Sequence, residues 1–527
     1  MKILTAAEMG AVDRRTAEEF GVPVAELMER AGEAVAAFCL RQYGGAKRVV
    51  VVCGKGNNGG DGLVAARVLA ETGRAVRVVL LGKMDEVKGE AAGALQRLRF
   101  EVPAVVVDEV ADESGLGDFG DAALLVDAVV GTGFRPPLRG VAAAVRDLVK
   151  AFAGPVVAVD VPSGWDADSM EQECAGAYRA DAVVTFTAPK LAHVFGHLTV
   201  GTFGAVVVAE IGSPEVAVRS ETGLGWTGSA KGVVEAPREV NANKGKFGHV
   251  LVVGGSYGKS GAPAMASLAA LRAGAGLVTA AVPKSVLGLV AGVAPELMVE
   301  GLAECPEGAV SFKNMEVAKL GVLLKRISVV AVGPGLSMEG DAPEFARQMV
   351  EKTTLPVVVD ADALNAFAGR EKRLRGEGRV MVLTPHPGEM ARLVGMTVKQ
   401  VEADRVGLAR RFAVEHQVTL VLKGWRTLVA HPDGTVGVNT SGNPAMAKGG
   451  SGDILTGIVA AMLAQYPDDV ARAVEAAVYL HGLAADFAVQ KMDEHTVLAT
   501  DTLGCLSDAF RYRVRDADGL VWVCGVR

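Results

Sequence analysis

Short runs of valine, leucine and isoleucine alternate with longer alanine- and leucine-rich stretches along the whole chain. Runs of the first kind are typical of strands buried on both faces, and stretches of the second kind are typical of helices. Their alternation predicts an α/β fold in which helices cover both faces of parallel sheets. In the first half the strands are expected at Val49 to Cys53, Ala75 to Leu81, Leu124 to Asp127, Val156 to Val161, Ala182 to Thr187 and Ala205 to Ile211.

The chain has 527 residues, which is more than one hydrophobic core usually organises, so at least two domains are expected. The pattern breaks between Ser213 and Ala236, where the glycine-rich stretch from Thr222 to Gly228 has neither strand nor helix periodicity. We therefore predict a first domain at residues 1–218, a linker at residues 219–235 and a second domain at residues 236–515.

Composition and charge narrow the function classes. Hydrophobic residues make up 50% of the chain and aromatic residues 5%, a balance that favours α/β folds over an aromatic-rich β-sandwich. The formal net charge of −7 argues against a nucleic-acid partner. The six cysteines show no CxxC spacing, and neither a secretory leader nor an apolar run of membrane length is evident. We therefore expect reduced thiols, no membrane partner and a cytoplasmic location.

A glycine-rich turn follows the first predicted strand, at Gly54-Lys55-Gly56-Asn57-Asn58-Gly59-Gly60-Asp61. Its glycines fit the GxGxxG pattern of nicotinamide dehydrogenases. The next strand contradicts that interpretation, because it runs into Gly82 and Lys83 where a ribose-binding acid is expected. A plain GxGxxG turn also has no need of asparagine and aspartate oxygens, which suit hard cations or polar ligands. The turn therefore predicts a different kind of ligand site.

Two further strand ends in this half carry oxygen-bearing side chains, in the segments Asp127 to Pro137 and Asp160 to Trp165. Open α/β sheets bind ligands at the edge where the carboxyl ends of their strands meet. Helix capping after a strand is the alternative role for Asp127 and Asp160. The combination of motifs favours a binding site.

A second glycine-rich segment, Lys448-Gly449-Gly450-Ser451-Gly452-Asp453, precedes the apolar run Ile454 to Leu463. Small residues that open a helix present backbone N–H groups at its positive end, which binds an anion such as phosphate. A carboxylate there is repelled by phosphate unless the chemistry uses it, so Asp453 is a candidate base for a hydroxyl that attacks phosphorus. An ordinary helix start with an acidic first turn is the alternative.

Three more segments of the second half place polar groups at the carboxyl ends of predicted strands: Asp360 to Asn365, Leu383 to Glu389 and Val421 to Thr427. A P-loop interpretation of Val253 to Ser260 fails, because Val253 stands where the first glycine is required.

The order of these motifs resembles two known enzyme families. The second half, from Asn243 through Val332-Gly333-Pro334-Gly335-Leu336 to Asp453, resembles the ADP- or ATP-dependent NAD(P)H-hydrate dehydratases of the ribokinase-like superfamily. The first half, from Leu27-Met28-Glu29-Arg30-Ala31-Gly32 to Thr187-Ala188-Pro189-Lys190, resembles the NAD(P)H-hydrate epimerase domain. The resemblance implies a Rossmann-like three-layer α/β/α sandwich and a ribokinase-like α/β/α sandwich. It also implies a bifunctional isomerase and lyase that repairs hydrated NADH and NADPH.

The resemblance assigns roles to residues of the first half. Asp160 is expected to act on the altered nicotinamide ring. Asn58, Asp127 and Ser163 are expected to bind potassium. The phosphates of the hydrate are expected at Asn57, Asn58, Gly59, Gly60, Asp61, Gly131, Thr132, Gly133, Phe134, Arg135, Pro136 and Pro137.

In the second half the resemblance implies phosphoryl transfer from ADP or ATP, with Mg²⁺ on the nucleotide, to the S hydrate, followed by loss of phosphate. Asp453 is the expected base. Ala445 and Lys448 depart from the residues expected in this stretch, which bears on the choice of phosphoryl donor. The hydrate is expected at Ala262, Gly335, His386 and Asp453, and the nucleotide at Lys423, Gly424, Trp425, Arg426, Thr427 and Gly452.

Two other functions stay open at this point. A ribokinase-like small-molecule kinase would share the anion site and the base, but it would release a stable phosphorylated product and has no need of the first domain. A nucleotide sensor with inactive sites has no reason to keep both Asp160 and Asp453. The sequence decides neither the donor nor the preferred hydrate, and it leaves the formation of a homo-oligomer open.

Overall fold

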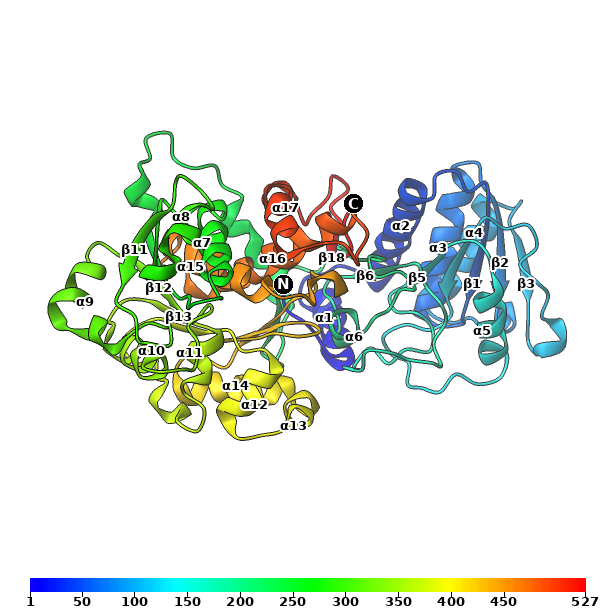
Figure 1. Cartoon of the computed structure of the whole chain (residues 1–527). Helices are drawn as coiled ribbons and strands as arrows, with labels where there is room; N and C mark the ends of the chain where they lie inside the picture. The colour runs from blue at the N-terminus through cyan, green and yellow to red at the C-terminus, as the bar shows by residue number, and fades with distance from the viewer. The chain divides into compact units, whose positions relative to one another are not determined.

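The computed structural model describes residues 1–527 and divides them into two compact units, each with its own sheet (Figure 1). Unit 1 comprises residues 1–224 and 513–527, and unit 2 comprises residues 225–512. The boundary falls inside the predicted linker at residues 219–235, which is ordered. Strand β8 occupies Leu224–Trp226 and a 3₁₀ helix follows at Thr227–Val234.

The side chain of Trp226 explains why the second part of the predicted linker belongs to unit 2. Trp226 is fully buried, its indole N–H donates to the Thr440 hydroxyl at 2.7 Å, and its ring meets Tyr479 edge-on at 5.7 Å. The chain end departs from the predicted boundary at residue 515 for the same reason. Trp522 is buried beside Phe38, and Asp516 pairs with Arg41, so the last residues complete unit 1.

Unit 1 is an eight-stranded sheet with the strand order β18-β7-β6-β5-β4-β1-β2-β3, and all its neighbouring strands are parallel except the β18–β7 pair. Its strands are β1 Arg48–Cys53, β2 Ala75–Leu80, β3 Val106–Glu109, β4 Leu124–Ala128, β5 Val156–Val159, β6 Ala182–Phe186, β7 Ala205–Ala209 and β18 Val521–Cys524. Its helices are α1 Ala6–Glu18, α2 Val24–Gln42, α3 Asn57–Glu71, α4 Glu90–Glu101, α5 Val141–Ala151 and α6 Leu191–Phe195.

Side chains of β1 point alternately to the two faces of this sheet, as strand geometry requires. Val49 and Val51 belong to the core beneath α2, α3 and α4, whereas Val50 and Val52 belong to the core beneath α5. The strand is therefore apolar at almost every position, and the unit has three layers with helices on both faces.

Unit 2 contains a ten-stranded sheet with the order β11-β10-β9-β12-β13-β14-β15-β16-β17-β8. Its remaining strands are β9 His249–Val253, β10 Leu277–Pro283, β11 Met298–Leu302, β12 Val329–Val332, β13 Val357–Val359, β14 Met381–Leu383, β15 Thr419–Leu422, β16 Leu428–Ala430 and β17 Val436–Val438. Its helices are α7 Gly261–Arg272, α8 Leu287–Ala291, α9 Val317–Leu323, α10 Ala342–Lys352, α11 Ala361–Asn365, α12 Pro387–Val394, α13 Val398–Ala403, α14 Arg405–His416, α15 Ser451–Gln465, α16 Val470–Val489 and α17 Ala499–Arg511.

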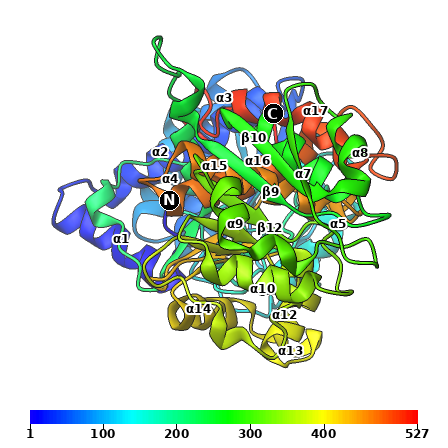
Figure 2. The ribbon, with the colours of Figure 1, turned by 60° about the vertical axis from the view of Figure 1, so that its left-hand side comes forward.

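Helices cover this second sheet on both sides as well. Helices α7, α15, α16 and α17 pack together on one side, where α15 contacts β9, β12 and β13. Helices α10, α12 and α14 lie on the other side (Figures 1 and 2). Both α/β folds that the sequence predicts are confirmed. In neither unit is any helix long and apolar enough to cross a lipid bilayer.

Candidate active sites

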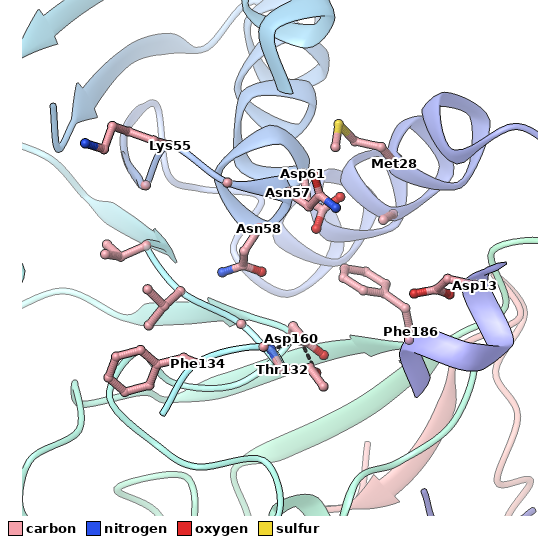
Figure 3. A pocket seen from close by; sticks show the side chains of 18 of the residues that line it. Asp13, Met28, Lys55, Asn57, Asn58, Asp61, Thr132, Phe134, Asp160 and Phe186 are labelled. Carbon is pink, nitrogen blue, oxygen red and sulfur yellow. Dashed lines mark hydrogen bonds between the residues drawn. The ribbon is translucent and has the colours of Figure 1, made fainter. Parts of the chain in front are cut away.

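Unit 1 encloses a cavity of about 1170 Å³ at the carboxyl edge of its sheet (Figure 3). The start of α3, the loops after β4 and β5, and helix α1 surround it. Of the residues predicted to bind the hydrate, it brings together Asn57, Asn58, Asp61, Gly131, Thr132, Gly133, Phe134 and Asp160.

Asp160, just after β5, is the centre of a buried hydrogen-bond network at this cavity. Its Oδ2 accepts from the backbone N–H of Thr132 at 2.7 Å and from the Thr132 hydroxyl. Its Oδ1 accepts from Thr185 Oγ1 at 2.9 Å and from Lys190 Nζ at 3.0 Å. The backbone of Asp160 has a φ of 69°, a strained conformation for a residue other than glycine that is typical of functional sites.

The network fixes the charge of Asp160. Burial alone would raise the pKa of this carboxyl group, but the Lys190 ammonium and the surrounding hydrogen-bond donors together outweigh burial and hold the pKa well below its usual range. His193 accepts the Lys190 N–H on Nδ1 at 2.9 Å, so its Nε2 donates to the Asp160 carbonyl at 2.7 Å. Burial, together with Lys190, lowers the pKa of His193 to about 4. Asp160 is therefore an anion beside a neutral imidazole.

Of the three residues predicted to bind potassium, Asn58 lines the cavity, whereas Asp127 and Ser163 are buried and do not line it. Ser163 donates to Asp127 twice, from its backbone N–H at 2.8 Å and from its hydroxyl at 2.6 Å. Burial raises the pKa of Asp127 to about 6, because no cationic side chain pairs with it. Asn58 reaches the same loop, since a Cβ atom on Gly131 would lie 2.9 Å from its Oδ1, and its Nδ2 is buried without a partner.

Other predicted residues do not face the cavity. Gly59 and Gly60 lie inside the first turn of α3, where a Cβ atom on Gly60 would collide with Met28. Arg135 turns away and pairs with Asp166 and Asp168 at 2.6 and 2.8 Å. The Pro136–Pro137 peptide bond is cis, and neither proline lines the cavity.

Sequence reasoning missed several charged residues that do line this cavity. Lys190 ends the segment from Thr187 to Lys190, but its position in the sequence alone assigns it no role. Arg139 lies just beyond the predicted segment, and Asp13 and Arg14 lie on α1, before the region of resemblance. The helical period of α1, with Met9, Val12 and Thr16 buried, was the signal that could have placed Asp13 on the neighbouring face.

In unit 2, the Gly449 to Asp453 segment forms the N-terminus of α15, as predicted. Gly450, with a φ of 97°, precedes the helix, and Asp453 lies in its first turn. Lys423, at the end of β15, points towards this turn, because a Cβ atom on Gly452 would lie 3.3 Å from Lys423 Nζ. A side chain at position 452 would therefore press on the lysine.

Asp360 holds Lys423 in place. It is buried at the end of β13, accepts from Lys423 Nζ at 3.1 Å and accepts from the Thr456 hydroxyl on α15 at 2.6 Å. Burial lowers the pKa of Lys423, but Asp360 and then Glu389 outweigh it and raise the pKa overall. Lys423 is therefore charged.

The carboxyl group of Asp453 has a pKa far above the ordinary value of an aspartate. Burial, together with the nearby carboxylate of Asp360, raises the pKa of Asp453 to about 7, while Lys423 opposes the rise. A carboxyl group with a pKa near neutrality suits a general base.

The other predicted hydrate residues are Ala262, Gly335 and His386. A Cβ atom on Gly335 would lie 3.2 Å from that of Ala262, so these two residues are adjacent. His386 caps α12 through Nδ1, which accepts from the N–H of Gly388 at 3.0 Å, and Glu389 accepts from the N–H of His386 at 2.8 Å. A carboxylate oxygen of Glu389 also lies 3.7 Å from Lys423 Nζ, so Glu389 links His386 to the cluster formed by Asp360, Lys423 and Asp453.

The predicted nucleotide segment divides into two parts. Lys423 points into the cluster, whereas Trp425 and Arg426 stack on each other at the turn after β15, with 4.4 Å from the guanidinium carbon to the ring. Thr427 bonds back to the Gly424 carbonyl at 3.2 Å and closes that turn. Lys448 donates to the carbonyls of His495 and Val497, both at 2.6 Å.

The two units thus define a class of protein. A Rossmann-like sheet with a charged cavity is joined to a ribokinase-like sheet with an anion-binding helix end, a lysine and a poised carboxyl group. This combination is typical of an enzyme that acts on a nucleotide at one site and transfers a phosphoryl group at another.

Comparisons with known proteins identify the family. The family described as NAD(P)H-hydrate dehydratase matches residues 250–507, and the family described as YjeF-related protein N-terminus matches residues 24–192. The Bifunctional NAD(P)H-hydrate repair enzyme Nnr of Moorella thermoacetica is 40% identical over 99% of both chains. The protein of the same name from Escherichia coli is 35% identical over 96% of this chain and 93% of its own. A crystal structure of the ADP/ATP-dependent NAD(P)H-hydrate dehydratase from Bacillus subtilis, co-crystallised with ATP and Mg²⁺, is 32% identical; it covers 53% of this chain and 96% of its own, with a TM-score of 0.45.

The chain therefore belongs to the family of bifunctional NAD(P)H-hydrate repair enzymes. It carries an epimerase for the R and S hydrates of NADH and NADPH and an ADP/ATP-dependent dehydratase that restores the reduced nucleotide. The prediction from the sequence is confirmed at this level.

Proposed function

We propose that the dehydratase reaction is carried by Asp453, Lys423 and the N-terminal amides of α15. Asp453 takes the proton of the hydroxyl group on ring carbon six of the S hydrate, and that oxygen attacks the terminal phosphorus of ADP or ATP. The amides of Gly449 to Gly452 and the Lys423 ammonium stabilise the charge on the transferring group. The phosphate then leaves with the hydroxyl oxygen, pushed out by the ring nitrogen, and loss of a proton from carbon five restores the dihydronicotinamide.

The single observation that carries this proposal is the contrast between two carboxyl groups near one lysine. Asp360 accepts hydrogen bonds from Lys423 and from the Thr456 hydroxyl, so it holds the lysine in position. Asp453 lacks such bonds, and burial raises its pKa to about 7. We assign hydrate binding to Ala262, Gly335, His386 and Asp453, and nucleotide binding to Gly452 and to Lys423, Gly424, Trp425, Arg426 and Thr427.

Magnesium belongs to this proposal as a companion of the nucleotide. The chain has no group of three or more His, Cys, Asp or Glu side chains arranged to hold a metal ion, which favours Mg²⁺ carried on the phosphates over a protein cage. Asp362 and Glu389, whose charges act on Asp453, are the carboxylates that fit it there. Bound Mg²⁺ would offset phosphate charge.

For the epimerase we propose that the ring lies beside Asp160 and the phosphates lie at the start of α3 and the loop from Gly131 to Phe134. The N-terminal amides of α3 favour an anion. Arg14 and Arg139 also line the cavity and add positive charge. Arg135, Pro136 and Pro137 shape that loop from outside the cavity.

Potassium fits the residues that the sequence assigned to it. Asp127 is a buried carboxylate with no cationic partner, and Asn58 Oδ1 faces the loop at Gly131, because a Cβ atom there would lie 2.9 Å from it. Asn58, Asp127 and Ser163 together offer oxygen atoms of the kind that alkali cations prefer over thiol or imidazole ligands. A cation held there would supply the missing positive charge and stiffen the floor of the cavity. We also place the enzyme in the cytoplasm, with its nicotinamide substrates.

An oxygen-18 label on the hydroxyl group of the hydrate tests the dehydratase proposal. With phosphoryl transfer to that hydroxyl, the label leaves in inorganic phosphate. With direct loss of water and separate hydrolysis of the nucleotide, the label leaves in water, and the proposed role of Asp453 fails. Accumulation of a stable phosphorylated hydrate would instead support a small-molecule kinase.

A further inference from the structure

Helix α1 contributes an acidic side chain to the epimerase cavity from outside the matched family region at residues 24–192. Asp13 lines this cavity together with Met9, Gly10 and Arg14, and it precedes the matched region at residues 24–192. In Figure 3, Asp13, Asp61 and Asp160 approach the cavity from different sides and from three separate elements.

The packing of α1 fixes Asp13 relative to Asp160. Val12, on the buried face of the helix, packs with Leu4 and Ala188. The backbone N–H of Leu4 donates to the Pro189 carbonyl at 3.0 Å, next to Lys190, and the first turn of the helix donates to Asp168 from Ala6 at 2.6 Å. The segment that carries Lys190 therefore also holds α1.

Asp13 has no structural partner of its own. It makes no hydrogen bond or ion pair, and its Oδ1 is buried without a donor. A buried polar atom without a partner destabilises a fold, so stability gives no reason for this carboxyl group. Burial raises the pKa of Asp13, and Asp160 raises it as well while Lys190 lowers it. The pKa of Asp13 is therefore shifted in the direction opposite to that of Asp160.

We propose that Asp13 is the catalytic acid of epimerisation, acting on the hydrate ring from the opposite side to Asp160. This inference rests on the proposed position of the ring beside Asp160. The Asp13 carboxyl group gives its proton to the hydroxyl group on ring carbon six as the carbon–oxygen bond breaks. The bonding pair leaves with the oxygen as water, and the lone pair of the ring nitrogen forms a nitrogen–carbon double bond.

Return of water to the other face completes the inversion. The oxygen of a water molecule forms the new bond to carbon six, its proton passes to the Asp160 carboxylate, and the double-bond electrons return to the ring nitrogen. The reverse reaction uses the same two groups with their roles exchanged. Proton exchange with solvent resets both carboxyl groups.

The test uses the full chain without nucleotide, so that dehydration cannot proceed. Pure R hydrate is added and its conversion to the S hydrate is followed by chromatography, with an enzyme-free sample to subtract spontaneous interconversion. The variants are Asp13→Asn, Asp13→Ala and Asp160→Asn. Glu19→Gln is the matched control, because Glu19 is an exposed acid at the end of the same helix and does not line the cavity.

Asp13→Asn should lower kcat for interconversion by about 100-fold, the usual scale for losing a general acid, and leave KM within about threefold. Incorporation of oxygen-18 from labelled water should fall with it, and the melting temperature of Asp13→Ala should not fall. Near-normal kcat in Asp13→Asn, or a loss that appears only in KM, overturns the inference. If Asp160→Asn alone is inactive, only the role of Asp13 fails. If both variants are active, the proposed position of the ring fails too.

Discussion

Replacing Lys190 with methionine should remove a large share of the stability of unit 1. Lys190 is fully buried, and its ammonium donates to Asp160 at 3.0 Å, to Thr185 at 2.7 Å and to the Phe186 carbonyl at 3.3 Å. Without it, the Asp160 carboxylate stays buried without a cation. Removing one partner of a buried ion pair costs about 3–5 kcal/mol. At about 2–4 °C per kcal/mol, the melting temperature of this unit should fall by about 6–20 °C.

Amide hydrogen exchange in the intact chain gives the assay, because peptides from β5 and β6 report the opening of unit 1 by itself. Lys55→Met is the comparison. Lys55 also lies 3.0 Å from a carboxylate, Glu86, but both side chains are about half exposed, so little change is expected. The double variant Asp160→Asn, Lys190→Met should regain most of the stability while its epimerase activity stays low, since the buried charge is gone but so is the catalytic carboxylate.

The stability lost in Lys190→Met should depend on pH. In the parent chain Lys190 holds the pKa of Asp160 low, so this stabilisation is present above the unfolded pKa and is lost only in strong acid. In Lys190→Met burial acts alone and raises the pKa of Asp160. The deficit should therefore shrink as the pH falls from neutral towards about 4 and the carboxyl group takes up a proton. A deficit below about 1 kcal/mol at neutral pH, or a double variant no more stable than the single one, would refute the reasoning.

Three other predictions concern single changes. Asp453→Asn should keep nucleotide binding but lower the rate of dehydration about 100-fold or more. In the parent protein, kcat/KM for dehydration should rise with pH and level off above about 7, as the Asp453 carboxyl group loses its proton. Normal turnover in the folded variant would remove Asp453 from the mechanism. Asp127→Ala should impair interconversion of the hydrates and its dependence on potassium while dehydration of pure S hydrate stays intact; equal loss of both activities would contradict separate sites. A fragment of residues 225–512 should fold and dehydrate S hydrate. A fragment of residues 1–224 should be unstable, because it lacks Trp522 and Asp516. Thermal unfolding of the two fragments tests both expectations.

Much of the fold could be predicted because the strands are buried on both faces. The expected strand from Val49 to Cys53 appears as Arg48–Cys53, and the other five expected strands of unit 1 match within two residues at each end. Strands β3 and β18 were not predicted from the sequence, and both lie at edges of the sheet. β3 is only half buried and ends in Asp108 and Glu109, so its sequence lacks the continuous apolar run of a central strand.

The sites divide in the same way. Residues at strand ends and helix starts, such as Asp160 and Asp453, could be found because parallel topology gathers them at one edge of each sheet. Residues that reach the site from distant parts of the sequence could not be predicted, because no sequence pattern links Asp13 or Lys190 to Asp160. The burial of Trp226 could not be predicted for a related reason. Glycines from Thr222 to Gly228 resemble a flexible joint, but Trp226 within them is a core residue that only tertiary packing explains.

The central claim is that two independent sites in one chain act in series on the hydrates. The most direct test mixes R and S hydrates with an excess of ADP or ATP and follows the return of dihydronicotinamide absorbance in the parent, Asp160→Asn and Asp453→Asn proteins. The parent should convert the whole mixture. Asp160→Asn should convert the S portion and then slow to the spontaneous rate, and Asp453→Asn should restore almost no reduced nucleotide while still interconverting R and S. Complete conversion by Asp160→Asn at the parent rate, or normal dehydration by Asp453→Asn, would contradict the account.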